Sequence, residues 1–271
     1  MNDNRVTAAD VRTCMRGDVY GDAETMTDAW FADHVARNDI DLARSPRWTV
    51  DGALVAFALL AFRGDRAWIG GFGVVPGSRG AGMGTVCVAD TLRIAREENA
   101  TSVELEVLAN NGAAIAIYQR GGFEQVGELV VWRREQRSIA GTAAYGILSD
   151  APRDAADVAA IARRPATCWQ REPRSVAMAA PFVTVTVGDE RAPSAYAFVR
   201  LGGPRGPLLL DAGAHDEAAA KALVGSLDAQ LAPHDLTLIN EPPGGPLDEA
   251  LSSNPFWEPI ARQRRMRVQL R

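Results

Sequence analysis

The stretch Val74-Val75-Pro76-Gly77-Ser78-Arg79-Gly80-Ala81-Gly82-Met83-Gly84 joins a strand-like run, residues 67–75, to a helix-like run, residues 85–97. Three glycines at alternate positions remove the Cβ atoms, so the backbone can close around a ligand. Free N–H groups at the start of a helix form an anion site. Arg79 adds a guanidinium whose donor fork suits phosphate. The stretch therefore predicts a pyrophosphate cradle between a strand and a helix.

Three glycine-loop chemistries compete for this stretch. A nucleotide P-loop needs Gly-Lys followed by Ser or Thr, and the one lysine of the chain, Lys221, is far away. A dinucleotide fingerprint needs G-x-G-x-x-G with an acidic residue about 20 residues on. The spacing here is G-x-G-x-G, although Glu104 and Glu106 lie in the right range. The dinucleotide interpretation is weakened rather than removed.

The third chemistry follows from a resemblance. Residues 74–84 resemble the acyl-coenzyme A loop of the GNAT acetyltransferases, V-x-P-x-x-R-G-x-G-x-G, at every fixed position. A second GNAT-like pattern, N-x-x-A-x-x-x-Y-x-x-x-G-F, is filled by Asn111, Ala114, Tyr118, Gly122 and Phe123. The resemblance covers roughly residues 6–134.

The resemblance implies acetyl-CoA as co-substrate, with Asn111 bonded to the pantetheine and Tyr118 near the thioester sulfur. Its implied cofactor-binding residues are Val74, Val75, Arg79, Gly80, Ala81, Gly82, Met83, Gly84, Thr85, Asn111 and Tyr118. A free N–H near Val74 would donate to the thioester oxygen.

Tyr118 and Glu106 are the predicted catalytic residues. A phenol has a pKa of about 10 and suits a general acid for a thiolate; packing on a helix face is the alternative role. The strand at residues 67–75 holds no Asp or Glu. Glu104 and Glu106 share one strand face, and Glu106, nearer the expected parting of the strands, is the base candidate. A structural carboxylate is the alternative.

The acceptor side is predicted in or after the second helix. Its candidates are Trp30, Phe31, Asp33, His34, Asp39, Asp41 and Trp68. Core packing explains the aromatic side chains equally well, and we expect His34 to be a surface histidine.

Composition limits the partners of the 271-residue chain. A net charge of −5 argues against a general nucleic-acid surface, and the basic run at residues 262–267 is interpreted as a solvated strand face. No apolar stretch approaches the ~20 residues of a membrane span. Three widely spaced cysteines and three histidines predict no metal site and a reduced cytoplasmic setting. A homodimer is compatible with the sequence.

The predicted element order, β-α-α-β-β-β-α-β-α-β, recurs weakly in the second half. We expect an α+β (mixed α/β) fold of tandem GNAT-like domains, residues 1–137 and 138–271, each a central mixed β-sheet flanked by helices. The second half resembles the degenerate C-terminal domain of two-domain bacterial GNAT proteins of the YitH type. Asp216 and Glu217 fall where pyrophosphate would lie and would repel it. A strand is predicted over residues 175–187.

The leading functional prediction is an acetyl-CoA-dependent N-acetyltransferase acting by direct transfer on a primary amine of a small molecule or peptide. The alternative is a non-catalytic acetyl-CoA-binding regulatory protein, suggested by the missing acidic residue and the degenerate second half. A nucleotide-dependent oxidoreductase is a third, supported only by the glycines.

Overall fold

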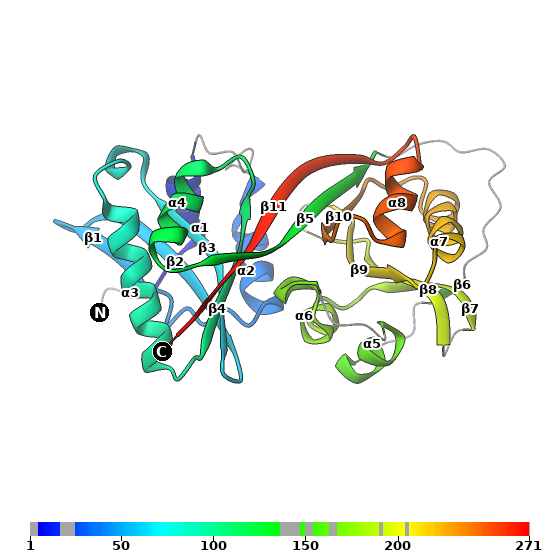
Figure 1. Cartoon of the computed structure of the whole chain (residues 1–271), viewed down its shortest axis with the longest axis horizontal. Coiled ribbons are helices and arrows are strands. Elements are labelled where there is room, and N and C mark those ends of the chain that lie inside the picture. The colour runs from blue at the N-terminus through cyan, green and yellow to red at the C-terminus, as the bar shows by residue number, and fades with distance from the viewer. Residues whose placement is uncertain are drawn as a thin grey trace. The chain divides into compact units, whose positions relative to one another are not determined.

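The structure, a computed structural model, describes residues 5–16, 25–135, 147–149, 154–162, 167–189, 192–203 and 206–270 (Figure 1). The helices are α1 (Ala8–Met15), α2 (Asp28–Arg37), α3 (Met83–Glu97), α4 (Gly112–Arg120), α5 (Ala155–Ala162), α6 (Pro173–Met178), α7 (Glu217–Gln230) and α8 (Pro246–Ser253), with 3-10 turns η2 (Pro76–Ser78) and η3 (Trp169–Arg171). The strands are β1 (Arg47–Val50), β2 (Ala53–Arg63), β3 (Arg66–Val74), β4 (Ser102–Leu108), β5 (Glu124–Arg134), β6 (Ile147–Ser149), β7 (Val183–Asp189), β8 (Ala192–Arg200), β9 (Leu208–Ala214), β10 (Leu236–Glu241) and β11 (Glu258–Gln269).

The chain forms two compact units, and the first of them combines the N-terminal part of the chain with its C-terminal end. The first unit comprises residues 1–127 and 263–271, and the second comprises residues 128–262. The last part of β11 therefore belongs with the first unit, because it pairs with β4 over seven positions, from Gln263↔Leu108 to Gln269↔Ser102. The predicted boundary at residue 137 lies outside the described residues.

The first unit is built on a mixed sheet in the order β1-β2-β3-β4-β11. Neighbouring strands are antiparallel except β3 and β4, which are parallel and joined through α3, as predicted. These two strands pair only from Arg66↔Ser102 to Trp68↔Glu104 and then part. The parting leaves one edge of β3 without a strand partner beyond Trp68, which is where a ligand can reach backbone groups.

Helices cover both faces of this sheet. In Figure 1, α3 and α4 lie on one face and α1 and α2 on the other. Alternate residues of β4 explain the first face, because Val103, Leu105 and Val107 point into a core with α3, α4 and β11. Met266 and Val268 of β11 complete that core.

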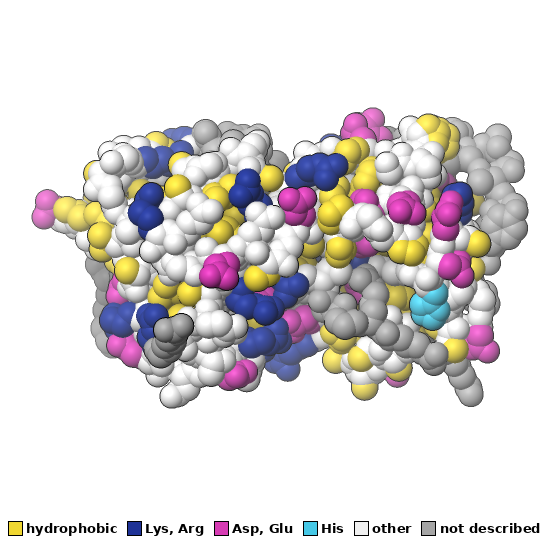
Figure 2. All heavy atoms as spheres, in the orientation of Figure 1, with side chains coloured by type: hydrophobic (Ala, Val, Ile, Leu, Met, Phe, Trp, Pro, Cys, Tyr) yellow, Lys and Arg dark blue, Asp and Glu magenta, His cyan; other side chains and the backbone are white. Residues whose placement is uncertain are grey.

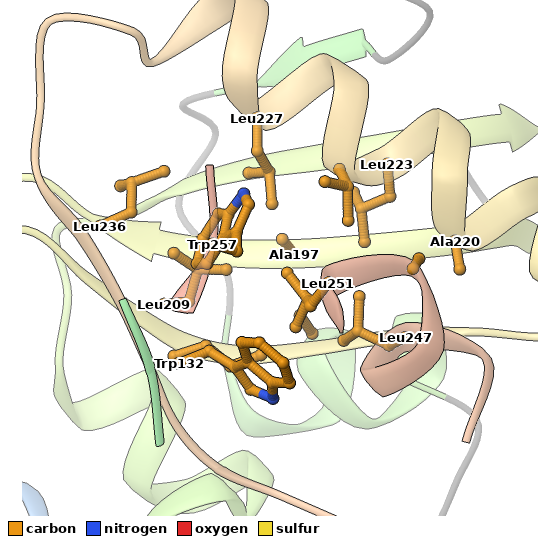
Figure 3. Close-up of a cluster of buried hydrophobic side chains, with 14 of the residues drawn as sticks. Trp132, Ala197, Leu209, Ala220, Leu223, Leu227, Leu236, Leu247, Leu251 and Trp257 are labelled. Carbon is orange, nitrogen blue, oxygen red and sulfur yellow. The ribbon is translucent and has the colours of Figure 1, made fainter. Parts of the chain in front are cut away.

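The second unit has the strand order β5-β10-β9-β8-β7-β6, with β9 and β10 parallel. Its main core packs leucines of α7 and α8 against β8, β9 and β10, with Trp132 and Trp257 among them (Figure 3). The prediction of a strand from residue 175 is wrong at its start, since residues 173–178 form α6. Pro173 occupies a first-turn position of that helix, where its missing N–H costs nothing.

Charged side chains of both signs are interspersed on the face of the molecule shown in Figure 2. Among the helices of the described ranges, none combines the length and the apolar character that crossing a bilayer requires.

Candidate active site

The glycine loop ends in a helix N-terminus that carries no side-chain cap. Gly82 is the N-cap of α3 and, like Gly80, has a positive φ, +80° and +81° respectively. An added Cβ would meet nothing within 4 Å at either position, so it is the backbone conformation that requires glycine. In the described part of the chain, no backbone N–H from Gly80 to Gly84 donates to another backbone group. Five consecutive amides are therefore available to an anion.

These amides border a cavity of about 490 Å³ in the first unit. The cavity collects eight of the predicted cofactor-binding residues, namely Val74, Arg79, Gly80, Gly82, Gly84, Thr85, Asn111 and Tyr118. Val75, Ala81 and Met83 do not line it. Two motifs that are about 30 residues apart in the sequence therefore meet at one cavity, as the family resemblance implies.

Close packing of α3 against α4 brings the two motifs together. A Cβ on Gly84 would lie 2.8 Å from Ile117 Cδ1, and one on Gly121 would lie 2.9 Å from Val88 Cγ1. Both distances are shorter than real Cβ contacts allow, so the two glycines set the helix separation. Asn111 caps α4 through Oδ1, which accepts from Ala114 N at 3.1 Å. Asn111 also lines the cavity.

Two arginines line the cavity, and they differ in what they bind. Arg79 donates to Val74 O at 3.0 Å and to Cys14 O at 2.7 Å, so part of its guanidinium holds the loop against β3 and α1. Arg120, in the last turn of α4, contacts Thr85 Oγ1 at 3.4 Å. Sequence reasoning assigned the phosphate charge to Arg79 and missed Arg120. The sequence signal that could have indicated Arg120 as a cavity residue is its position two residues after Tyr118, on helix α4, which packs against α3.

Tyr118 lies at the buried end of the cavity. Its side chain is 6% exposed and makes edge contacts with the rings of Phe72 and Phe123, at centroid distances of 6.1 and 5.6 Å. The aromatic contacts fix the ring and leave it bordering the cavity, close to the parted edge of β3.

The edge of β3 supplies backbone groups at that point. Val75 N–H donates to Val55 O at 2.9 Å, so this amide is committed to the neighbouring strand. Because successive residues of a strand alternate in direction, the backbone groups of Val74 face the parted side. The carbonyl of Val74 shows this by accepting from Arg79. Val74, rather than Val75, thus turns its backbone groups to the parted side of β3.

Glu106 lies on the other face of β4 from Tyr118 and does not line the cavity. Its Oε2 accepts from Trp68 Nε1 at 2.8 Å, while its Oε1 is buried and has no hydrogen-bond partner among the described residues. Burial raises the pKa of Glu106 to about 7, with the nearby Glu104 adding to the effect and the Trp68 bond and Arg265 opposing it. A carboxylate of this kind can take a proton near neutral pH.

The other acceptor-side candidates have structural partners. His34 is buried rather than on the surface as expected, because its Nε2 bonds Gly70 O at 2.9 Å and its ring stacks on Trp30. Asp39 pairs with Arg63 at 2.9 Å and Asp41 pairs with Arg44. Trp68 is buried and donates to Glu106, so this predicted aromatic residue contacts a catalytic candidate.

The second unit has the corresponding strands and helix, but its own side chains fill the equivalent positions. The N-terminus of α7 is capped by Asp216, which accepts from Ala219 N at 2.8 Å. The parallel strands β9 and β10 pair only at Leu208↔Thr237 and Leu209↔Leu238.

The guanidinium of Arg171 occupies the parting of β9 and β10. It bonds Ala212 O at 2.7 Å on β9 and Asn240 O at 2.9 Å on β10. It also pairs with Asp211 and Glu241, each at 2.6 Å, while its own side chain is fully buried. Asp216 and Glu217, which the sequence predicts to repel a phosphate, thus lie at the start of α7, and Asp216 uses its carboxylate to cap that helix.

Comparison with known proteins gives one family model that matches part of the first unit, and solved structures that share the fold of the chain. Residues 12–123 match the model described as Acetyltransferase (GNAT) family. No curated protein matches the chain significantly. The similarity to proteins of the YitH type stays a prediction.

Solved structures match nearly the whole chain. A GCN5-related N-acetyltransferase from Sphaerobacter thermophilus is 14% identical with a TM-score of 0.67, covering 99% of this chain and 95% of that one. A putative acetyltransferase from Pyrococcus horikoshii is 14% identical with a TM-score of 0.63, covering 98% and 88%. A tandem GNAT protein from the clavulanic acid biosynthesis pathway is 15% identical with a TM-score of 0.54, covering 82% and 81%. At these identities the likeness concerns the fold, and it agrees with the predicted tandem mixed α/β architecture.

Proposed function

We propose that this protein, whose residues 12–123 match the model of the acetyltransferase (GNAT) family, moves the acetyl group of acetyl-CoA directly to a primary amine. The observation that carries the proposal is the row of five unbonded amides, Gly80 to Gly84, at the uncapped start of α3. They open on a cavity that reaches Tyr118 and the edge of β3. Anion-binding amides, a deep cavity and a polar inner end fit a long phosphorylated thioester.

Each part of the site has one task in this proposal. Acetyl-CoA supplies the acetyl thioester. The amides of residues 80–84 and Arg120 hold its phosphates, and Asn111 Nδ2 bonds its amide-containing arm. Val74 N–H polarises the thioester oxygen. Holding both reactants in place removes an entropic barrier of up to about 7–11 kcal/mol.

Proton transfer is assigned to Glu106 and Tyr118. Glu106 takes a proton from the ammonium form of the acceptor, and the neutral amine then forms its bond to the acetyl carbon as the carbon–sulfur bond breaks. Tyr118 gives its proton to the departing thiolate and regains one from the nitrogen as the amide forms, while Glu106 releases its proton to solvent. The transfer is direct, since Cys14 and Cys87 of the first unit are buried. Burial raises the pKa of these thiols to about 12 and about 11, so neither is an effective nucleophile.

The second unit takes no acetyl-CoA in this proposal. Asp216 closes the start of α7 and Arg171 fills the parting of β9 and β10, so we expect one acetyl-CoA per chain. The acceptor is a small-molecule or peptide amine. The non-catalytic alternative is not favoured, because a buried carboxylate with a pKa of about 7 has a use in proton transfer but none in holding a cofactor.

A charge inserted at the start of α3 tests the cradle. Thr85→Glu places a carboxylate in the first turn beside the amides, as Glu217 does in α7. Val86→Glu is the matched control, because Val86 is the next residue and is 63% exposed. A carboxylate in the first turn favours the helix itself in both variants.

Calorimetry with acetyl-CoA is the measurement. We expect micromolar binding with a stoichiometry of one for wild type and Val86→Glu, and at least 10-fold weaker binding for Thr85→Glu. Equal affinity in all three proteins would place the phosphates elsewhere. Release of free thiol with an amine panel, absent without an amine, completes the test of transfer.

A further inference from the structure

The last strand of the chain places two arginines on the sheet face that carries Glu106. Arg265 and Arg267 of β11 lie opposite Glu106 and Glu104 of β4, respectively. Side chains of directly opposed residues on one sheet face lie about 4.5–5.5 Å apart at Cβ. The three side chains Glu104, Arg265 and Arg267 are called the arginine clamp below.

Both guanidinium groups turn toward Glu104 rather than straight across the strands. Arg265 donates to Glu104 Oε2 at 2.9 Å through Nη2, and Arg267 donates to Oε1 at 2.9 Å through Nε. The carboxylate of Glu104 is 4% exposed, and these bonds hold the pKa of its carboxyl low against the effect of burial. One buried carboxylate therefore fixes two arginines in place.

The clamp keeps unused donor capacity. Among the bonds of the described residues, none engages Nη1 of Arg265 or of Arg267. The two side chains are 24% and 36% exposed, so an acceptor molecule can reach them. With one carboxylate for two guanidinium groups, the clamp carries a net charge of +1, which a second anion would balance.

Glu106, whose Oε1 accepts no bond in the described part of the chain, lies beside the two arginines whose Nη1 groups donate none there. Glu106 Oε1 is buried without a partner, and Glu106 is the residue directly opposite Arg265. A proton acceptor and a pair of anion-binding arginines thus occupy adjacent positions on one face, next to the point where β3 and β4 part. A molecule with an amine and an anionic group a few bonds apart matches both.

We propose that Arg265 and Arg267 bind a carboxylate of the acceptor, so that the preferred acceptor is an α-amino acid or a similar amine that carries its carboxylate within a few bonds. This inference rests on the proposed acetyl transfer and names its substrate class. The carboxylate bridges the two Nη1 groups, and the amine reaches Glu106 on the same face. The C-terminal strand is then a specificity element of the first unit.

Arg265 has a second effect that gives an independent readout. The groups around Glu106 are Glu104 on its own strand, Trp68 and Arg66 on β3, Arg265 on β11 and, behind Trp68, His34 of α2. Burial and Glu104 raise the pKa of Glu106, whereas the bond from Trp68 and the charge of Arg265 lower it. Loss of the Arg265 charge therefore moves the acid limb of the pH–rate profile to higher pH.

Matched acceptors and matched variants test the proposal on the full chain. The acceptors are several α-amino acids and their carboxamides, which keep the amine and remove the negative charge. The variants are Arg265→Gln, Arg267→Gln and the charge-conserving Arg265→Lys. The control is Arg264→Gln, on the same strand, one residue along and therefore on the opposite face. Thermal melts report whether each variant folds.

We expect wild type to prefer each amino acid over its carboxamide. Loss of Arg265 shifts the pKa of Glu106 and so lowers the rate with both acceptor types at acidic pH, and KM is therefore compared at pH 9. There, Arg265→Gln and Arg267→Gln should raise KM for the amino acids about 10-fold or more and change KM for the carboxamides far less, with Arg265→Lys between. Arg264→Gln should match wild type. A wild-type preference for carboxamides, or equal losses on both acceptor types, would overturn the proposal. Absence of transfer to every amine would instead refute the proposed acetyl transfer.

Discussion

Glu106 shows at the scale of one residue how the fold prepares a base. Its alternation with Leu105 and Val107 puts it on the face of β4 away from the main core, where it is half-buried and its carboxylate accepts a bond from Trp68. One oxygen is bonded and the other has no partner in the described part of the chain. An unsatisfied buried carboxylate is unfavourable for stability, and it is consistent with use in proton transfer.

The pH dependence of activity follows from this carboxyl. With a pKa of about 7, it is ionised above neutrality, so kcat/KM should fall as the pH drops below about 7. Glu106→Gln should lower kcat by about 10²–10⁴-fold and remove this limb. Rates measured from pH 5.5 to 9 decide the point. An acid limb that persists unchanged in the variant would assign the base to another group.

The pH dependence of stability runs opposite to that of activity, because the ionised form of Glu106 that the reaction needs is the form that destabilises the folded protein. Because its pKa in the folded protein lies above the ordinary 4.5, the folded state holds the proton more tightly than the unfolded chain. Its stabilising contribution is present below pH 4.5 and is lost as the pH rises through about 7. Glu106→Gln should therefore be more stable than wild type at pH 8.5 and nearly equal at pH 5, by urea unfolding. A variant destabilised equally at both values would contradict this.

At the scale of elements, the two corresponding helices differ in their first residue. The N-cap of α3 is Gly82, which has no side chain to cap the helix, whereas the N-cap of α7 is Asp216, whose carboxylate caps it. The uncapped helix leaves its amides to a ligand, and the capped helix uses them internally. This contrast supports acetyl-CoA binding by the first unit.

Gly82→Ala tests the geometry of the cradle. Alanine at φ +80° is strained by roughly 1–2 kcal/mol, which would displace the amides and weaken acetyl-CoA binding about 10-fold. Gly77→Ala is the control, since it lies in the same loop with open space and no positive φ. Calorimetry compares the two. Equal affinities would show that the loop conformation at residue 82 does not matter for binding.

Arg171 predicts a stability effect in the second unit. Arg171→Met leaves the carboxylates of Asp211 and Glu241 buried without their cation, at a cost of about 3–5 kcal/mol. Arg133→Met removes the exposed pair with Asp235, at 3.5 Å, and should cost under about 1 kcal/mol. Urea unfolding of both variants at pH 7 gives the comparison. Similar small losses would mean that Arg171 is not what holds β9 and β10.

At the scale of the whole molecule, the first unit depends on residues from the far end of the chain. Met266 and Val268 enter its core, and the arginine clamp joins β11 to β4. A fragment of residues 1–137 lacks this strand, so β4 becomes an exposed edge. We expect the fragment to aggregate and to lose acetyl-CoA binding, as judged by size-exclusion chromatography and calorimetry.

Adding the missing strand provides the control for that truncation. Residues 1–137 joined by a flexible linker to residues 258–271 should recover solubility and binding. A soluble fragment of residues 1–137 with full-chain affinity would show that β11 is dispensable to the first unit.

The sequence by itself determined the local parts of this protein. The loop from Val74 to Gly84, the helix after it and the pattern from Asn111 to Phe123 were predictable, because glycine spacing, helix signals and strand alternation act over a few residues. These patterns also predicted the mixed sheet and the parallel pair β3 and β4. The sequence did not predict that Arg120 lines the cavity or that His34 is buried. Both depend on contacts between elements that are distant in sequence.

Only the tertiary structure decided how these parts combine. The basic run at residues 262–267, interpreted from sequence as a solvated face, holds Glu104 because β11 pairs with β4 across more than 150 residues. The start of α6 replaced a predicted strand, since Pro173 favours a first helical turn. The tertiary structure also raises the pKa of Glu106 and brings Arg171 to its two carboxylates. Both features result from burial and from pairing between distant segments, and a short window of sequence contains neither.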